Sequence, residues 1–406
     1  MDRSDDRVLI IGAGPVGLCL ALALANEGVK SFVIEQLSDE NFLDQIPRAG
    51  TNHPATLEMY EKIGLYQKLE PRGIVAPRFH YWDGAKRERI AEFDHIHLKN
   101  DTRFPFVLQC ERIKIVEEAL AMVKASAMTE VLMGATFTGF TQDSDSVTAF
   151  VENEDGEKES IRGRYLVSGE GARSIIRDEL GIEFEGFTYS DRTLTIQVAY
   201  DFTQHGYEQR NYISHPEEYS NLFHWKGPPN CWRVHFPTEP NEEEDALTRP
   251  EAMQERLQRL LPTGRPFEIV GRNLYSVHQR VAQEFRKGRA ILAGDAAHVN
   301  SPIGAMGLNS GVHDAFNLAD KLSRILRGEG DEALLDLYGR QRRYVAVQHT
   351  QAQTIRNKRL LAEKDSAVRQ RNHDELRRKA EDPKLAREFL LRTSLFNSLS
   401  EAAQIT

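Results

Sequence analysis

The fold is decided by residues 8–17, VLIIGAGPVG, close to the start of the chain. An apolar run of β type ends there in the spacing G-x-G-x-x-G, and helix-forming residues follow as far as residue 25. A second apolar run, residues 31–34, ends at Glu35. Glycines at this spacing let phosphate oxygens approach the N–H groups of a helix start, and the acid can accept hydrogen bonds from a ribose. The pattern predicts a β-α-β dinucleotide-binding unit, and Glu35 favours the adenosine of FAD or NAD over a ribose with a 2′-phosphate.

A second informative stretch is residues 288–311, GRAILAGDAAHVNSPIGAMGLNSG. Its apolar run ends at Gly294 and Asp295 and is followed by small residues and a helix start. This pattern predicts a buried strand that delivers a carboxylate to the mouth of a nucleotide site. The later glycines let backbone N–H groups approach a ligand closely, and Asn309 is expected to cap the following helix.

Length and composition narrow the class of protein. The 406 residues suit two domains with elaborations, and no apolar run reaches the ~18 residues of a membrane helix. The net charge of −9, without a basic stripe in the body, argues against a nucleic-acid partner. Cys19, Cys110 and Cys231 form no CxxC pair and no ligand cluster, which favours reduced thiols, no metal site and no disulfide-reductase chemistry. The start of the chain lacks a signal-peptide pattern, so we expect a cytoplasmic protein.

The C-terminal part of the chain is basic and helical in pattern. Residues 356–392 carry 12 Lys and Arg against 7 Asp and Glu, with leucines at helical spacing. We expect a solvated helix face that packs back on the body or on a second subunit of a homodimer. A membrane or nucleic-acid role for this tail is the alternative.

Taken in order, the motifs resemble those of the single-component FAD-dependent aromatic hydroxylases of the 4-hydroxybenzoate hydroxylase type. The resemblance covers residues 5 to about 345 and rests on these motifs: G-x-G-x-x-G with Glu35, Arg48-Ala-Gly, Gln109, SGEGARS at 168–174, and GDAAH…PxGAxGLN at 294–309. It implies an α/β fold in which a Rossmann-like FAD-binding domain is interleaved with a β-sheet substrate domain. The implied divisions are 1–77, 95–192 and 270–350 for FAD, 78–94 and 193–269 for the substrate, and 351–406 as C-terminal helices.

The resemblance also implies which residues hold FAD. They are Gly12, Gly14, Pro15, Val16, Gly17, Glu35, Gln36, Arg48, Gln109, Asp295, Gly307, Leu308 and Asn309. The first glycines would hold the pyrophosphate, Arg48 and Gln109 the pyrophosphate and ribityl region, and Asp295 the ribityl hydroxyls. Backbone N–H groups from Gly307 onward would face the flavin pyrimidine and stabilise its reduced, anionic form.

One motif departs from the family. Glu170-Gly171 stands where the family has D-G. The longer acid leaves two interpretations open, namely contact with the flavin and nicotinamide route, or a turn that caps a helix.

The implied reaction is a hydroxylation. NADH or NADPH reduces FAD, O2 adds to form the flavin C4a-hydroperoxide, and this oxidises a phenolic or hydroxylated N-heteroaromatic ring. The substrate can be a carboxylate, and hydroxylation with loss of CO2 is a variant. A flavin-dependent reductase or halogenase of the same fold, or a non-enzymatic redox sensor, is the alternative, although the halogenase motif W-x-W-x-I-P is absent.

The substrate is expected against the aromatic-rich residues 193–237. Tyr212 begins YISHP, which resembles a Y-x-x-H-P segment whose Tyr orients the phenol in the 4-hydroxybenzoate branch. Phe223 and Trp225 stand where that branch has a Ser and an Arg, so its carboxylate clamp is not expected here. The candidate substrate-site residues are Tyr212, His224, Trp225, Arg233, His278 as a base or anchor, and Pro302, whose carbonyl would border flavin and substrate.

Overall fold

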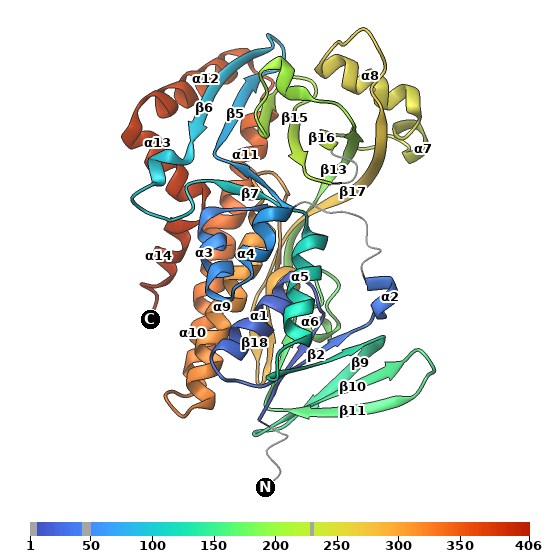
Figure 1. Ribbon diagram of the computed structural model, residues 1–406, viewed down its shortest axis with the longest axis vertical. Coiled ribbons are helices and arrows are strands. Elements are labelled where there is room, and N and C mark those ends of the chain that lie inside the picture. Colours follow the sequence, from blue (N-terminus) through green and yellow to red (C-terminus); the bar gives the residue numbers. More distant parts are fainter. Residues whose placement is uncertain (1–5, 43–49, 228–230) are drawn as a thin grey trace.

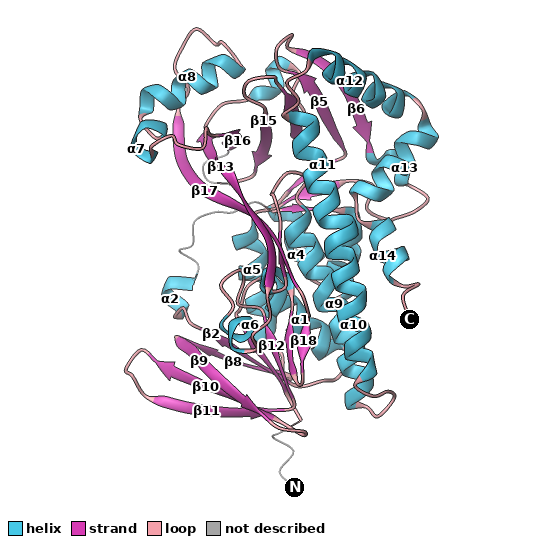
Figure 2. Cartoon of the chain, turned by 180° about the vertical axis from the view of Figure 1, so that it is seen from behind, coloured by secondary structure: helices cyan, strands magenta, loops and turns pink. Residues whose placement is uncertain are grey.

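Two large β-sheets organise the chain, one toward each end of the molecule (Figure 1). The computed structural model describes residues 6–42, 50–227 and 231–406. Two long strands, β13 (Phe184–Val198) and β17 (Ile269–Ala282), pair with each other and run from the upper sheet toward the lower one (Figure 2). The predicted α/β class is confirmed.

The lower sheet is the predicted dinucleotide-binding unit. Its strand order is β18-β19-β12-β1-β2-β8, parallel except for β18. The strands are β1 (Val8–Ile11), β2 (Ser31–Glu35), β8 (Thr129–Met133), β12 (Tyr165–Ser168), β18 (Arg286–Lys287) and β19 (Ala290–Leu292). The apolar residues of the central strands β1, β12 and β19 are buried on both faces, as expected for the centre of a parallel sheet. The carboxyl ends of β1, β12 and β19 therefore meet at one edge, where the glycine motif and Asp295 follow.

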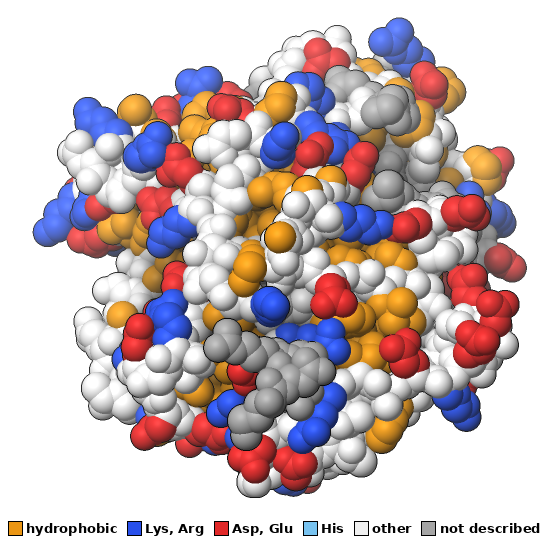
Figure 3. All heavy atoms as spheres, turned by 60° about the horizontal axis from the view of Figure 1, so that its bottom comes forward, with side chains coloured by type: hydrophobic (Ala, Val, Ile, Leu, Met, Phe, Trp, Pro, Cys, Tyr) orange, Lys and Arg blue, Asp and Glu red, His pale blue; other side chains and the backbone are white. Residues whose placement is uncertain are grey.

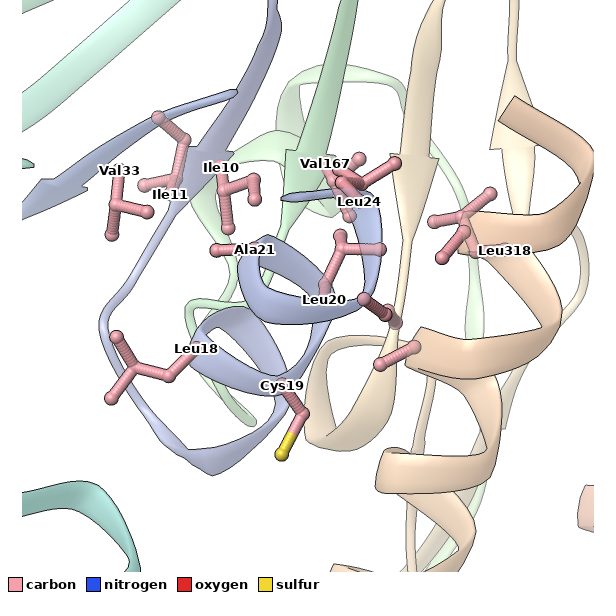
Figure 4. Packing of buried hydrophobic residues seen from close by; sticks show 14 of the residues in the cluster. Ile10, Ile11, Leu18, Cys19, Leu20, Ala21, Leu24, Val33, Val167 and Leu318 are labelled. Atoms are coloured by element: carbon pink, nitrogen blue, oxygen red, sulfur yellow. The ribbon is translucent and has the colours of Figure 1, made fainter. Parts of the chain in front are cut away.

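Packed helices cover one side of this sheet. Close to β1, the helix α1 (Pro15–Asn26) packs against α9 (Met306–Leu326) and α5 (Arg112–Lys124). Figure 4 shows Leu20 and Leu24 of α1 between Val167 of β12 and Leu318 of α9. This packing is entirely apolar, so it fixes the helix start that follows the glycine motif.

The upper sheet has the strand order β20-β17-β13-β16-β15-β14-β5-β6. Its other strands are β5 (Arg78–Asp83), β6 (Glu88–Asp94), β14 (Arg210–Ser214), β15 (Ser220–Trp225), β16 (Cys231–Pro237) and β20 (His298–Val299). The early strands 78–94 join those of 193–269 because β5 pairs in parallel with β14. The domain boundaries drawn from the sequence stay a prediction.

Smaller sheets and helices complete the chain. The small sheets comprise β3 (Thr51–Asn52), β4 (Ile74–Ala76) and β7 (Val107–Gln109), and β9 (Ala135–Gln142), β10 (Val147–Asn153) and β11 (Lys158–Gly163). The remaining helices before the C-terminal region are α2 (Asp39–Phe42), α3 (Pro54–Lys62), α4 (Tyr66–Leu69), α6 (Ile175–Glu179), α7 (Glu244–Leu247) and α8 (Pro250–Leu260). Short 3-10 turns are η2 (Glu70–Arg72), η3 (His95–Leu98), η4 (Phe202–His205) and η5 (Gly294–Ala296).

The C-terminal helices pack back on the body of the molecule, which is one of the two arrangements expected from the sequence. The helix α10 (Ala333–Tyr344) continues through a π-helical turn, η6 (Val345–Gln351), into α11 (Ala352–Leu361). Then come α12 (Ser366–Glu381), α13 (Pro383–Thr393) and α14 (Phe396–Ala402).

Apolar and ionic contacts fix α12 and α13 on the upper sheet. Phe389 of α13 stacks on Phe93 of β6 with ring centroids 4.2 Å apart. Arg369 of α12 forms an ion pair with Asp83 at 3.0 Å. Part of the basic charge of the tail is thereby used inside the molecule.

The surface carries both signs of charge. Lys and Arg side chains are interspersed with Asp and Glu over the face seen in Figure 3. Within the described part of the chain, no helix is long and apolar enough to cross a membrane.

Candidate functional site

The turn between β1 and α1 contains two glycines that close packing requires and a third that faces open space, where a ligand can bind. A Cβ on Gly12 would lie 2.6 Å from the Gly169 carbonyl oxygen, and one on Gly17 would lie 2.1 Å from the Gly12 carbonyl oxygen. A Cβ on Gly14 would meet nothing within 4 Å. Gly14 is also the N-cap of α1, with no side-chain cap and no acid in the first turn. The helix start therefore leaves its N–H groups for an anion, as a pyrophosphate requires.

Glu35 lies buried at the end of β2, beside this turn. Its carboxylate accepts hydrogen bonds from the backbone N–H of Ala13 at 2.8 Å and of Leu37 at 3.0 Å. The acid thus holds the glycine turn in place at the position expected for the adenosine ribose. Gln36 follows on the surface, and Arg48 lies outside the described residues.

Gln109 is a buried side chain with a spare donor. Its Oε1 accepts a hydrogen bond from Thr51 Oγ1 at 2.6 Å. Its Nε2 is buried and has no hydrogen-bond partner among the residues that the structure describes. A buried amide N–H without a partner costs about 1–3 kcal/mol, so a ligand acceptor at this point would remove a penalty.

Asp295 lies exposed in η5, directly after β19. The loop that carries it is fixed by Asp314 of α9, whose Oδ2 accepts from Gly294 N–H at 2.9 Å and lies 2.8 Å from His298 Nε2. Burial by itself would raise the pKa of Asp314, but Arg342 and His298 overcome this effect and hold it at about 2. Sequence reasoning missed this network because Asp314 and Arg342 come together only when α9 packs on α10.

The start of α9 corrects one expectation. The helix begins at Met306, and its N-cap, Ala305, has φ +57° and no side-chain cap. Asn309 lies inside the first turn and does not cap it. Instead Asn309 Oδ1 accepts from His53 N–H at 2.8 Å, and Nδ2 donates to the Thr51 carbonyl at 2.8 Å. Asn309 therefore ties α9 to the neighbouring strand β3 and leaves the helix start free.

Gly307 and Leu308 belong to that same free first turn, whose N–H groups have no intrahelical acceptor. The α1 start, the α9 start and Gln109 Nε2 supply uncommitted donors that suit an anionic, many-acceptor ligand. These features fit FAD.

The contacts of Glu170 favour the second interpretation of its turn, namely that it caps a helix. Its carboxylate accepts hydrogen bonds from Ser168 Oγ and Ser174 Oγ, each at 2.7 Å, and from Ile175 N–H at 3.1 Å. Ser174 is the N-cap of α6. The acid is thus used at the start of α6.

A cavity lies between the upper sheet, the loop before α9 and the C-terminal helices. It holds about 340 Å³ of space, part of it open to solvent. Its lining residues are His53, Phe79, Tyr81, His95, Arg210, Tyr212, Gly304, Met306, Asn357, Phe389 and Thr393. Gly304 and Met306 belong to the segment that precedes and begins α9, so this cavity adjoins the proposed flavin-facing helix start.

Arg210 is the feature of this cavity that sequence reasoning missed. The side chain is buried, and its Nη2 donates to Tyr212 Oη at 3.1 Å. Its Nε and Nη1 have no hydrogen-bond partner, and no carboxylate among the described residues forms an ion pair with it. The guanidinium also lies over the Phe79 ring, 5.0 Å from the centroid. A buried cation without a counter-ion is costly, which suits the cavity to an anion.

Two buried histidines line the same cavity without adding charge. Burial, and then the charge of Arg210, lower the pKa of both His53 and His95 to about 3. His53 Nε2 lies 2.9 Å from the Gly304 carbonyl, and His95 Nδ1 lies 2.8 Å from the Pro77 carbonyl. Because a carbonyl only accepts, these nitrogens carry the protons. The opposite nitrogen of each ring is left as an acceptor.

Of the predicted substrate residues, Tyr212 lines the cavity, whereas Arg233 and Trp225 do not. Strand register places Arg210, Phe223 and Arg233 in one row on one face of the sheet. Arg233 lies beyond Phe223, where its Nη2 pairs with Glu111 at 2.7 Å, and its guanidinium lies 4.8 Å from the Trp225 ring centroid. This charge is already compensated, so a lining role for Arg233 and Trp225 is not supported.

His224 and His278 lie elsewhere. The ring of His224 stacks on Trp232, 4.7 Å away between centroids, on the opposite face of the sheet. His278 is exposed on β17, with its Nδ1 2.9 Å from Thr188 Oγ1. The geometry does not support either as a base. Pro302 is exposed, and its carbonyl accepts from Ala305 N–H at 2.9 Å in the turn before α9.

Comparison with known proteins agrees with this geometry. A family model described as "FAD binding domain" matches residues 5–353. Para-nitrophenol 4-monooxygenase from Pseudomonas sp. (strain WBC-3) is 32% identical over 389 residues, which are 95% of this chain and 94% of that protein. The 6-hydroxy-3-succinoylpyridine 3-monooxygenase HspB from Pseudomonas putida (strain DSM 28022 / S16) is 29% identical over 338 residues, 83% of this chain and 84% of that protein.

A solved structure shows the same fold along nearly the whole chain. The crystal structure of p-nitrophenol 4-monooxygenase PnpA from Pseudomonas putida DLL-E4 has a TM-score of 0.90 and 32% identity, and covers 97% of this chain and 98% of that one. The resemblance predicted from the motifs is thereby confirmed. The chain belongs to the FAD-dependent aromatic hydroxylases and is an FAD-containing monooxygenase that uses O2 and NADH or NADPH to hydroxylate a phenolic ring.

Proposed function

We propose that this enzyme hydroxylates a small para-substituted phenol, bound as its phenolate, at the ring carbon that carries the para substituent. The observation that carries the proposal is Arg210, a buried guanidinium in the cavity with only Tyr212 Oη as a hydrogen-bond partner among the described residues. A phenolate oxygen is the anion of matching size and charge. A hydrogen bond to a charged group contributes about 1.5–3 kcal/mol, enough to select the anion over the neutral phenol.

The rest of the cavity supports a flat aromatic anion. Tyr81 stacks on Tyr212 with centroids 5.3 Å apart, and Phe79 lies edge-on to Tyr212 at 6.0 Å. The histidines add no competing positive charge, since the pKa of each is about 3. Asn221, opposite Tyr212 on the same sheet face, keeps its Oδ1 buried without a hydrogen-bond partner among the described residues. Aromatic walls exclude water while Arg210 and Tyr212 hold the oxygen end.

The names of the two relatives support the position of attack. The locants in para-nitrophenol 4-monooxygenase and 6-hydroxy-3-succinoylpyridine 3-monooxygenase each place oxygenation at the substituted carbon para to the hydroxyl. A phenolate oxygen donates electron density to that carbon. With a nitro substituent the balance is one phenol, one O2, one NAD(P)H and one proton, giving one quinone, one nitrous acid, one NAD(P)+ and one water.

FAD supplies the redox chemistry when bound, by taking electrons from the nicotinamide and activating O2. We propose that Gly14 and the start of α1 at Pro15 and Val16 hold its pyrophosphate. Gly12 and Gly17 would shape this turn, with Glu35 and Gln36 on the adenosine side. Gln109 and Asp295 would hold the ribityl region, and the α9 start at Gly307 and Leu308 the pyrimidine edge. We also propose that Pro302 borders the flavin and that Arg48 contacts the pyrophosphate.

We also propose a cytoplasmic homodimer as the working form. Cys19, Cys110 and Cys231 are free and buried, which fits a reducing compartment. Light scattering of the holoenzyme tests the dimer.

The test is turnover of the FAD-loaded enzyme with 4-nitrophenol, using NADH and NADPH in parallel. We expect the phenol to stimulate oxidation of either NADH or NADPH. One nitrite should be released per substrate molecule, and the product should contain one oxygen atom from labelled O2. A nitrocatechol product without nitrite would place attack beside the hydroxyl and contradict the proposed position.

A second candidate is a hydroxylated pyridine, which the HspB relative favours. The assay is the same with 6-hydroxypyridine-3-carboxylate, where loss of CO2 replaces loss of nitrite. Faster turnover of the pyridine than of the phenol would reverse the order of the two candidates.

A further inference from the structure

A second cavity adjoins the reaction cavity on the side of the C-terminal helices. It is formed by the π-helical turn η6, the start of α11 and the end of α13. Met306, His349, Ala352, Arg356 and Arg392 are among the residues that line it. None of the flavin-binding motifs except the first residue of α9 contributes to it.

The two cavities share one lining residue and are otherwise bordered by neighbouring residues of the same helices. Met306 lines both. On α11 Arg356 lines the second cavity and its neighbour Asn357 lines the first. On α13 the same relation holds for Arg392 and Thr393. Because Met306 has an unbranched, flexible side chain, it is the part of this border that can move most easily.

The second cavity is positively charged. Arg356 is exposed, and Arg392 is partly buried with its Nε lacking a hydrogen-bond partner in the described structure. No described carboxylate forms an ion pair with either guanidinium, whereas His349 at the rim lies 3.1 Å from Glu401. Burial, and then the nearby charge of Arg356, lower the pKa of Arg392. Two uncompensated cations therefore converge on this cavity.

The reaction cavity needs such an approach. Tyr212, Arg210 and His53 are each less than 5% exposed. An anion that reaches Arg210 must pass apolar walls such as Phe79 and Phe389. A charged vestibule that borders the cavity lowers the free energy of the anion before this step and raises its local concentration.

We propose that the second cavity is the entrance for the anionic substrate, with Arg356 and Arg392 attracting the phenolate and Met306 as the movable partition. The inference rests on the proposed function, because it takes the phenolate as the ligand. It assigns to the C-terminal helices, most of which lie beyond the FAD-binding family match, a role in substrate entry.

The first experiment measures association and dissociation rates of 4-nitrophenolate by stopped flow on the oxidised holoenzyme at mildly alkaline pH. Arg356→Glu should slow association roughly fivefold at low salt and less at high salt, with little change in dissociation. The matched control is Arg359→Glu, which makes the same charge change on an exposed residue of α11 that does not line the cavity. Equal association rates for the two variants would overturn the role of Arg356.

The second experiment obstructs the path. Ala352→Phe places a ring in the second cavity without touching the reaction cavity. Association and dissociation should both slow about tenfold while Kd stays within about twofold, because a barrier on the path leaves the end states unchanged. Ala352→Ser should behave as wild type. FAD content confirms that each variant is folded.

The outcomes separate the two proposals. If wild-type holoenzyme fails to bind 4-nitrophenolate, the proposed substrate is wrong and the entrance proposal falls with it. If wild type binds and Ala352→Phe leaves both rates unchanged, the proposed function stands and the entrance is refuted.

Discussion

Arg210 donates a hydrogen bond to Tyr212 Oη at 3.1 Å, two residues along the same strand and on the same face of the sheet. The tyrosine is thereby placed to share whatever the guanidinium binds. Arg210 is the only permanently charged side chain among the described residues that line the reaction cavity. The pair therefore sets the charge preference of the site.

Replacing Arg210 should weaken phenolate binding. For Arg210→Gln we expect Kd to rise roughly tenfold to a hundredfold, since a charge-assisted hydrogen bond contributes about 1.5–3 kcal/mol. FAD content should stay unchanged. Titration of the flavin absorbance with 4-nitrophenol measures the effect.

The matched control for that variant is Arg233→Gln, another buried arginine in the same row of the sheet. In this variant Glu111 loses its ion pair with Arg233 and keeps the one with Lys114, at 2.9 Å, so the free energy of unfolding should fall. The Kd for the phenolate should stay within about threefold. If Arg233→Gln weakens binding and Arg210→Gln does not, the anion site is at Arg233.

Substitutions at Gly14 and at Gly17, both in the turn between β1 and α1, should have different effects. Gly14→Val should give a folded apoprotein that does not retain FAD, since its side chain points into open space at the helix start. Gly17→Ala should destabilise the fold itself, because its Cβ would lie 2.1 Å from the Gly12 carbonyl oxygen. Circular dichroism and flavin absorbance distinguish the two. A yellow, FAD-loaded Gly14→Val protein would place the pyrophosphate elsewhere.

Stability should fall steeply as the pH falls below neutrality. His53, His95 and His313 are buried and His235 is half-buried, and burial is the main cause that lowers the pKa of each to about 3 from the ordinary 6.5. Above pH 6.5 neither state binds protons at these rings. Between 6.5 and about 3 only the unfolded chain does, so protonation favours unfolding by up to about 1.4 kcal/mol per pH unit for each histidine.

His313→Gln tests this sign, since His313 contacts Thr56 on α3 and does not line the reaction cavity. The slope of unfolding free energy against pH in this window should become shallower by up to about 1.4 kcal/mol per pH unit. Urea unfolding at several pH values measures it. An unchanged slope would mean that His313 is protonated in the folded protein.

Phe389 of α13 should control the size of the substrate. Its ring stacks on Phe93 and borders the reaction cavity. For Phe389→Ala we expect a loss of about 3–5 kcal/mol in stability and a shift of kcat/KM toward phenols with bulkier substituents. Phe389→Leu should retain more stability and an intermediate preference. The same order of kcat/KM among these phenols in wild type and in both variants would place Phe389 outside substrate selection.

The sequence by itself determined the cofactor half of the enzyme. Gly12, Gly14, Gly17 and Glu35 are close together in the chain, and the strand, turn and helix around them are local structures with fixed geometry. Asn309 shows where this reasoning stopped, because its side chain binds Thr51 and His53, more than 250 residues away.

Only the tertiary structure decided the substrate half. Period-two alternation in 193–237 gives two faces but does not say which one meets the flavin or which charges are already paired. Arg233 and Arg210 look alike in the sequence, yet Glu111, the N-cap residue of α5, compensates Arg233 and leaves Arg210 without a carboxylate partner among the described residues. The sequence predicts C-terminal helices that pack on the body or on a second subunit, and only the structure shows that their packing on β6 brings Phe389 and Thr393 to the cavity. Which side chains are paired and which are buried depends on how distant segments of the chain pack together. A local sequence pattern carries no information about that packing.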